Sequence, residues 1–171
     1  ERVFTMMNEE VEDFNGTVEF DPTTTTGYID FRHVGFSYVP GKPVLKDFNI
    51  DMYSGHKIAL VGATGSGKTT IVNLLLRFYD IDSGQILIDG KDIKEMSKKD
   101  LRDCISIVLQ DAVLFGDTVE NNVKYGKSDA TDEEFENALK MANCYKFVQR
   151  LPQKEKTILS EGATNISQGQ R

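Results

Sequence analysis

The stretch that most constrains the fold is residues 62–70, GATGSGKTT, which directly follows the apolar run 58–61. Its first eight residues fit the pattern G-x-x-x-x-G-K-[ST], and the apolar residues at 71, 74, 75 and 78 then have the spacing of one helix face. A buried strand, a glycine-rich loop and an amphipathic helix in this order predict an α/β fold in which the loop cradles phosphate groups.

The chemistry of this loop follows from its residue types. Glycines let backbone N–H groups approach an oxyanion without a Cβ in the way, and the start of the helix adds a favourable dipole. Lys68 is predicted to reach the β- and γ-phosphates as a catalytic charge, and Thr69 to offer its hydroxyl to Mg²⁺. The alternative is a glycine-rich turn that binds no ligand. The predicted nucleotide-binding residues of this segment are Gly62, Thr64, Gly65, Ser66, Gly67, Lys68, Thr69 and Thr70.

Composition narrows the classes of function. The formal net charge is −7 over 171 residues, which argues against a nucleic-acid-binding face because such faces concentrate basic residues. No apolar run approaches the roughly 18 residues of a membrane-spanning helix, and the N-terminus has no apolar signal-peptide segment. Cys104 and Cys144 lack metal-binding spacing and are predicted to pack in the core.

Hydrophobic periodicity predicts the order of the elements. Alternating apolar residues predict strands between 28 and 52, and short apolar runs predict further strands at 57–61, 86–88 and 105–109. Beyond residue 115 the pattern becomes helical: Thr131 with Glu134 predicts a capping box at a helix start, and an apolar stripe follows, made of Phe135, Leu139, Met141, Ala142 and Phe147. These elements predict an α/β P-loop NTPase core that begins with an antiparallel β subdomain and continues into a partial helical subdomain.

A phosphate-binding loop alone does not name a reaction. The guanine-reading tetrad [NT]KxD does not occur in the sequence. Residues 86–89, ILID, imitate the apolar strand ending in an acid that hydrolases of this class need, but Gly90 rather than Glu follows Asp89. An Asp-Gly turn is the better interpretation. The expected metal-binding Asp and the catalytic carboxylate are therefore not found in this chain.

Three further features lie in a definite order around the loop. Tyr38 precedes Gly62 by 24 residues, Gln110 ends an apolar run well after the loop, and the sequence closes with NISQGQR. Together with the P-loop, this order resembles the nucleotide-binding domain of ATP-binding cassette (ABC) transporters of the exporter type, over residues 28–171. Within that family the sequence is most similar to one subunit of bacterial heterodimeric multidrug exporters.

The resemblance implies a role for each of these residues. Tyr38 resembles the aromatic residue that stacks on adenine, although an alternating strand also accommodates a tyrosine in a core. Gln110 resembles the catalytic glutamine that contacts Mg²⁺ and senses the γ-phosphate, although alone it would be interpreted as a surface residue. Residues 111–126 resemble the segment that faces the coupling helices of the membrane domain. The signature motif, which binds the γ-phosphate held by the opposite subunit, corresponds to Ser167, Gln168, Gly169 and Gln170.

Two departures from the family pattern qualify the resemblance. Gln168 stands where the usual signature LSGGQ has a glycine, and this puts a close approach of the backbone to phosphate in doubt. The Walker B carboxylates and the switch histidine of the family would lie beyond Arg171. We therefore expect an N-terminal fragment truncated before Walker B. Its parts are a connector from the membrane domain at 1–27, the β subdomain with the P-loop core at 28–112, and the helical subdomain at 113–171.

The resemblance also implies a function for the parent protein. It would couple binding and hydrolysis of ATP, with Mg²⁺, to transmembrane export, at the cytoplasmic face of the cell membrane. Its expected partners are the membrane domain, through the coupling helices, and a second, non-identical nucleotide-binding domain, with no nucleic acid. The 171-residue chain alone is expected to be inactive. The alternatives are a soluble ABC-type ATPase, and a nucleotide-binding fragment without activity of its own.

Overall fold

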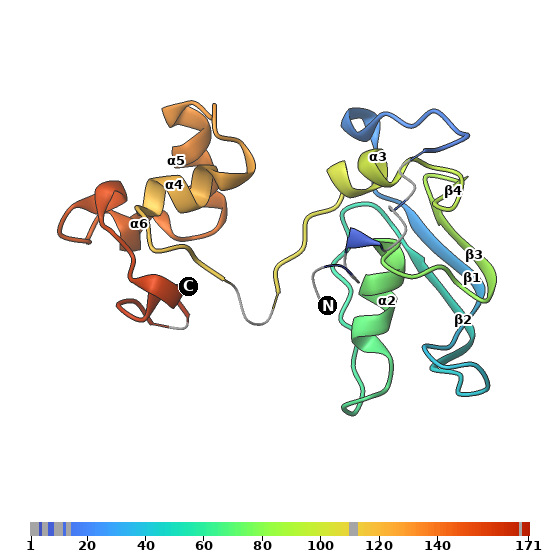
Figure 1. Cartoon of the computed structure of the whole chain (residues 1–171). Coiled ribbons are helices and arrows are strands. Elements are labelled where there is room, and N and C mark those ends of the chain that lie inside the picture. Colours follow the sequence, from blue (N-terminus) through green and yellow to red (C-terminus); the bar gives the residue numbers. More distant parts are fainter. Residues whose placement is uncertain (1–3, 5–6, 9–11, 13–14, 110–112, 168) are drawn as a thin grey trace. The chain divides into compact units, whose positions relative to one another are not determined.

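The computed structural model describes the whole chain except residues 1–3, 5–6, 9–11, 13–14, 110–112 and 168 (Figure 1). The chain forms two compact units, residues 1–107 and residues 108–171. Among the described residues, no helix has the length and apolarity needed to cross a membrane. The α-helices are α2 (Lys68–Leu75), α3 (Lys98–Asp103), α4 (Val119–Val123), α5 (Asp132–Met141) and α6 (Tyr145–Val148), with short 3₁₀ turns at Pro22–Thr24, Lys124–Gly126, Lys154–Lys156 and Glu161–Ala163.

The first unit is built on a four-stranded antiparallel sheet (Figure 1). Its strands lie in the order β2-β1-β3-β4, and the register joins Ile29 to Met52 on one side and to Ile88 on the other. The predicted antiparallel start is therefore confirmed. The strands are β1 (Ile29–Phe36), β2 (Leu45–Met52), β3 (Ser83–Ile88) and β4 (Lys91–Asp92).

Strand β1 contains an irregularity that explains its sequence pattern. His33 has a φ of 51°, and the register with β2 shifts between Phe31 and Val34. Adding a residue to one strand turns the following side chains to the opposite face. Phe31 and Val34, which lie three residues apart, are consequently both buried.

Helix α2 packs its apolar stripe into the core of the first unit. Ile71 and Leu74 are buried in the same cluster as Phe31, Phe36 and Leu45. The predicted stripe extended to Phe78, and there the prediction was wrong, because α2 ends at Leu75 and the side chain of Phe78 is 53% exposed.

Two predicted strands are absent. Residues 56–63 and 105–109 contain no regular secondary structure, and Val61 and Val108 are each 92% exposed. An apolar run becomes a strand only where a neighbouring strand accepts its backbone hydrogen bonds. Within the described part of the chain, no strand pairs with either segment.

The segment predicted as a connector contributes to the first unit. Phe20 is buried in the core, and the backbone N–H groups of Thr17 and Val18 donate to the carbonyl oxygen of Glu95. The carboxylate of Glu12 receives hydrogen bonds from the Arg102 guanidinium at 2.9 and 3.0 Å and from Lys98 at 2.8 Å. Hydrogen bonds from Arg102, and then from Lys98, lower the pKa of Glu12 from 4.5 to about 2.

The second unit is helical, as its sequence pattern predicts. The capping box at the start of α5 is present: the Thr131 hydroxyl accepts from the N–H of Glu134, and the Glu134 carboxylate accepts from the N–H of Thr131. Met141 was predicted in the apolar stripe of this helix, but it is 87% exposed because α5 ends at this residue. The buried centre of the unit consists of Val119, Leu139, Val148, Leu159 and Ala163.

Candidate functional site

The glycine-rich loop adopts a conformation that depends on its glycines. Gly65 and Gly67 have φ values of 83° and 91°, a left-handed region that L side chains rarely occupy. A Cβ on Gly67 would also lie 3.1 Å from Cδ2 of Leu45, so the loop approaches β2 closely there. A Cβ on Gly62 would lie 2.5 Å from Oγ of Ser66. These positions therefore suit glycine on both conformational and steric grounds.

The loop leads into an uncapped helix N-terminus. Gly67 is the N-cap of α2, and no side chain caps the helix there. The first turn of an α-helix has N–H groups without intrahelical acceptors, and the aligned peptide dipoles place partial positive charge at that end. This combination of free N–H donors and positive potential suits a phosphate group.

Lys68 adds a full charge to these donors. Its ammonium donates to the carbonyl oxygens of Gly62 at 2.7 Å and Ala63 at 2.8 Å, so the side chain folds over the loop that precedes it. A polyphosphate seated on the loop would offer this ammonium charged acceptors in place of two neutral ones. The residues present therefore fit a nucleotide polyphosphate.

The two threonines after the lysine differ in environment. Thr69 is exposed, which leaves its hydroxyl accessible to a metal ion bound with the phosphates. Thr70 is 5% exposed, and its hydroxyl accepts a hydrogen bond from the Tyr38 hydroxyl at 3.2 Å. The phosphate loop and the predicted adenine-binding tyrosine are thus joined directly through the first turn of α2.

Tyr38 lies beside the loop with part of its ring accessible. It is 45% exposed, and its hydroxyl oxygen also accepts from the side-chain amide of Asn73 at 3.4 Å. Two further residues contact Tyr38 that no sequence pattern indicated: Asn73, and Tyr79, whose ring packs against the Tyr38 ring. The helical spacing of Thr70 and Asn73 places them on one face of α2, but no local pattern indicates which aromatic residue that face meets.

The remaining predicted site residues lie elsewhere. Ser167, Gly169 and Gln170 belong to the second unit, where the N–H of Ser167 donates to the Gln170 side chain at 2.9 Å and the N–H of Gln170 donates to the carbonyl oxygen of Ser167. Gln110 and Gln168 lie outside the described residues. The structure therefore brings together Tyr38 and the residues of the loop.

Asp89 occupies the turn between β3 and β4. It has a φ of 50°, and Gly90 follows with a φ of 80°. Its carboxylate accepts from the N–H and hydroxyl of Thr26 and from the N–H of Tyr28. Burial opposes ionisation, but these hydrogen bonds outweigh it and lower the pKa of Asp89. The interpretation of Asp89 as a turn residue is confirmed.

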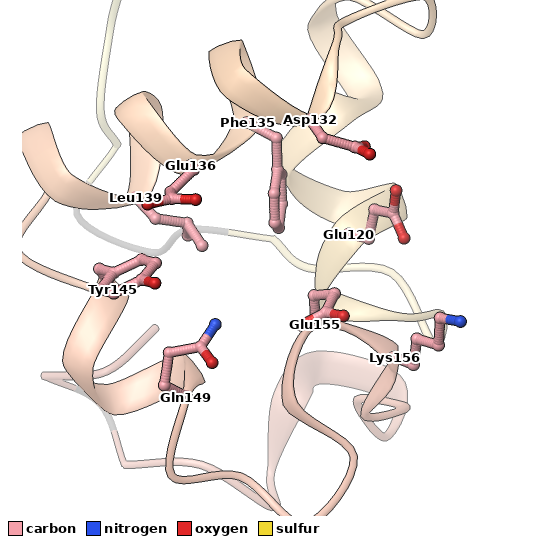
Figure 2. Close-up of a pocket in the computed structure, with 9 residues that line it drawn as sticks. All are labelled: Glu120, Asp132, Phe135, Glu136, Leu139, Tyr145, Gln149, Glu155 and Lys156. Carbon is pink, nitrogen blue, oxygen red and sulfur yellow. The ribbon is translucent and has the colours of Figure 1, made fainter.

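A cavity in the second unit has a different character (Figure 2). It measures about 510 Å³, with Phe135, Leu139 and Tyr145 among its walls. Four carboxylates also line it, against one lysine, so it would repel a polyphosphate. We therefore place no nucleotide there. The charged side chains in its wall are Glu120, Asp132, Glu136, Glu155 and Lys156.

Comparisons with known proteins agree with the P-loop geometry. A family model described as ABC transporter matches residues 45–171. Over 171 residues the chain is 44% identical to the ABC transporter ATP-binding protein YfiC of Bacillus subtilis, covering all of this chain and 28% of that protein. It is 43% identical over 171 residues to a fatty acid ABC transporter ATP-binding/permease protein of Mycobacterium bovis, covering all of this chain and 27% of that protein.

A solved structure of a bacterial Atm1-family ABC exporter with ATP bound matches 98% of this chain and 29% of its own chain, with a TM-score of 0.86 and 35% identity. The chain thus spans less than a third of the length of these relatives. The α/β fold with its antiparallel sheet is confirmed by this likeness, because the match extends over nearly the whole chain. Since the family model covers most of the sequence, the chain belongs to the ABC transporter family, as part of its ATP-binding domain.

Proposed function

We propose that this chain is the ATP-binding part of an exporter and that residues 62–69 bind the phosphates of ATP together with Mg²⁺. The observation that carries the proposal is the ammonium of Lys68, which lies over a glycine loop at an uncapped helix N-terminus. In such a place a polyphosphate meets N–H donors, a helix dipole and a full positive charge at once.

Each residue of the site has a part in this binding. The N–H groups from Gly65 to Thr69 orient the phosphates, and Lys68 exchanges its carbonyl acceptors for β- and γ-phosphate oxygens. Thr69 and Gln110 are the residues proposed to hold Mg²⁺, which supplies charge neutralisation at the phosphates when bound. Tyr38 presents its accessible ring to adenine, and its hydroxyl bond to Thr70 keeps that ring beside the loop.

The experiment that tests this site removes the charge of Lys68. A charge-assisted hydrogen bond contributes roughly 1.5–3 kcal/mol, so Lys68→Ala should weaken MgATP binding about ten- to a hundredfold in calorimetry. Lys42→Ala is the matched control, because Lys42 is exposed in the turn after Tyr38. This substitution removes the same charge but leaves the phosphate loop unchanged. Equal MgATP affinity for the Lys68 variant and the wild type would refute the assignment.

In the full-length protein, we propose that ATP binding and hydrolysis drive export, with the chain at the cytoplasmic face of the membrane. The names of two relatives support this proposal, since one is an ATP-binding/permease protein and the other an ABC exporter. Partners would be a membrane domain and a second nucleotide-binding domain, whose ATP would meet Ser167, Gln168, Gly169 and Gln170. Replacement of the usual signature glycine by Gln168 supports a non-identical second domain. Mass spectrometry of the purified assembly would contradict that point by finding a single polypeptide species.

A further inference from the structure

Tyr38 is one of three aromatic rings that pack against one another in the first unit. Its ring meets Phe36 edge to face, with centroids 4.8 Å apart and an interplanar angle of 85°. On another side it meets Tyr79 at 5.0 Å and 89°, and Phe36 and Tyr79 are themselves 5.8 Å apart. Edge-to-face pairs of this kind are the favoured arrangement of aromatic rings. The two ring neighbours therefore hold the plane of the Tyr38 ring, while Thr70 and Asn73 hold its hydroxyl.

The two neighbours differ in how firmly they are held. Phe36 belongs to β1 and is 4% exposed, so the core fixes it. Tyr79 is 47% exposed and lies beyond the end of α2. Among the residues that the structure describes, no side chain or backbone group forms a hydrogen bond with its hydroxyl. Its contribution to the cluster is therefore the packing of the ring.

The end of α2 is what brings Tyr79 back to Tyr38. The N–H of Phe78 donates to the carbonyl oxygen of Asn73 at 2.9 Å, and the N–H of Arg77 donates to that of Leu74 at 3.0 Å, with Arg77 at a φ of 53°. These are the two bonds of a Schellman motif, which reverses the chain at a helix C-terminus.

Arginine is an uncommon residue at the left-handed position of this motif, where glycine is usual. Here the side chain of Arg77 is itself held, because it donates to Asp80 and to the carbonyl oxygens of Ile93 and Met96. The turn that carries Tyr79 is thus held by the backbone hydrogen bonds to α2 and by the hydrogen bonds of the Arg77 side chain. Helix α2 consequently begins in the phosphate loop and ends at the turn that places Tyr79 on Tyr38.

We propose that Tyr79 is a positioning residue for the nucleobase: its ring holds Tyr38 in the orientation in which the exposed part of Tyr38 stacks on the purine of a nucleotide. This inference rests on the proposed function, in which Tyr38 is the adenine-binding residue. Tyr79 acts through Tyr38, so it affects ligands that carry a base and leaves the bare polyphosphate unaffected. Its ring is sufficient for this role and its hydroxyl is dispensable.

The test compares two ligands on the full-length protein. Calorimetry measures the affinity for MgATP and for magnesium triphosphate in the wild type, Tyr79→Ala, Tyr79→Phe, Tyr38→Ala and the double variant Tyr38→Ala/Tyr79→Ala. Because Tyr79→Ala removes an aromatic pair that stabilises the orientation of Tyr38, it should weaken MgATP binding about three- to tenfold. Tyr79→Phe should restore wild-type affinity, and triphosphate affinity should be the same throughout. Tyr53→Ala is the matched control, because Tyr53 is an exposed tyrosine of the same unit that packs on Tyr28 and His56 instead.

The outcomes separate this inference from the proposed function. If Tyr38→Ala weakens MgATP but Tyr79→Ala does not, the positioning role is refuted and the adenine role of Tyr38 survives. If Tyr79→Ala weakens both ligands equally, its effect is on the fold and the inference is overturned. If Tyr79→Ala still weakens MgATP in the Tyr38→Ala background, Tyr79 does not act through Tyr38, which also overturns it. If Tyr38→Ala leaves the ratio of the affinities for MgATP and magnesium triphosphate unchanged, the proposed adenine site itself is wrong.

Discussion

The antiparallel sheet and two apolar segments of the chain, 56–63 and 105–109, have similarly strand-like sequences but different structures. In the sheet, β1 pairs with β2 on one side and β3 on the other, and Phe31, Val34 and Phe36 are buried. In the segments the backbone has no regular structure, and Val61 and Val108 are largely exposed. Strand β1 pairs with β2, which follows it closely in sequence, and with β3, which follows the phosphate loop and α2, whereas within the described residues no strand pairs with either segment.

This difference has a consequence for the phosphate loop. Within the described residues, the segment that enters the loop, 56–61, pairs with no strand and has Leu60 partly buried against the core, whereas the helix that leaves the loop is fully packed in the core through Ile71 and Leu74. The conformation of the loop is therefore maintained mainly from its C-terminal side. Gly67 against Leu45 and Tyr38 against Thr70 are the contacts that connect this side of the loop to the sheet.

Hydrogen exchange should reveal the largest difference between the two regions. Amides of β1 take part in ladders on both sides, so they should exchange at least about a thousandfold more slowly than unprotected amides. The amides of 57–61 and 106–109 form no backbone hydrogen bonds within the described residues and should exchange nearly freely. Mass spectrometry of peptides from both regions makes this comparison. Equal protection in the full-length protein would show that these segments pair with a strand outside the described residues.

Truncation of one apolar side chain in each region sharpens the comparison. Leu74 is fully buried, so Leu74→Ala should lower the free energy of unfolding by about 2–5 kcal/mol. Val61 is 92% exposed, so Val61→Ala should change it by less than about 0.5 kcal/mol. Denaturant unfolding of the wild type and both variants measures these two changes in the free energy of unfolding. A loss at Val61 as large as that at Leu74 would mean that this segment is buried in the protein that was measured.

The smallest expected effect concerns the ion pairs of Glu12 with Arg102 and Lys98. The pKa of Glu12 is lowered in the folded state from 4.5 to about 2, so its ion pairs stabilise the fold above pH 4.5 and this stabilisation is lost as the pH falls towards 2. Glu12→Gln should therefore be less stable than the wild type at pH 7, and the gap should close on acidification. Glu19→Gln is the control, since the Glu19 side chain forms no ion pair in the described part of the chain. A gap independent of pH would contradict the ion-pair account.

Local patterns predicted the parts of the fold that depend on neighbours in sequence. The Asp89-Gly90 turn and the Thr131–Glu134 capping box are interactions over one to three residues, and both are present. The helix ends at Leu75 and Met141 were missed, because apolar spacing continues past the residue at which the backbone turns. The strands predicted at 57–61 and 105–109 are absent, because strand formation depends on a partner strand that a local sequence pattern does not reveal.

The candidate site likewise has one part that a local sequence pattern predicts and another part that it does not. The glycine pattern of residues 62–69 indicates the loop, since conformation and chemistry are both encoded in one short stretch. The packing of Tyr79 on Tyr38 could not be predicted, because it depends on a helix end and a strand end that meet across forty intervening residues. Phe20 in the core was missed for the same reason, since its charged surroundings indicate a surface segment.

The guanidinium of Arg102 has a mechanical consequence. It donates to both carboxylate oxygens of Glu12 and, on its other side, to the carbonyl oxygens of Leu76 and Arg77 at the end of α2. A guanidinium is a rigid plane with its donors at fixed angles, so these groups cannot separate without breaking hydrogen bonds. A displacement of Glu12 is therefore transmitted through Arg102 to the C-terminal end of α2, the helix whose first residue is Lys68.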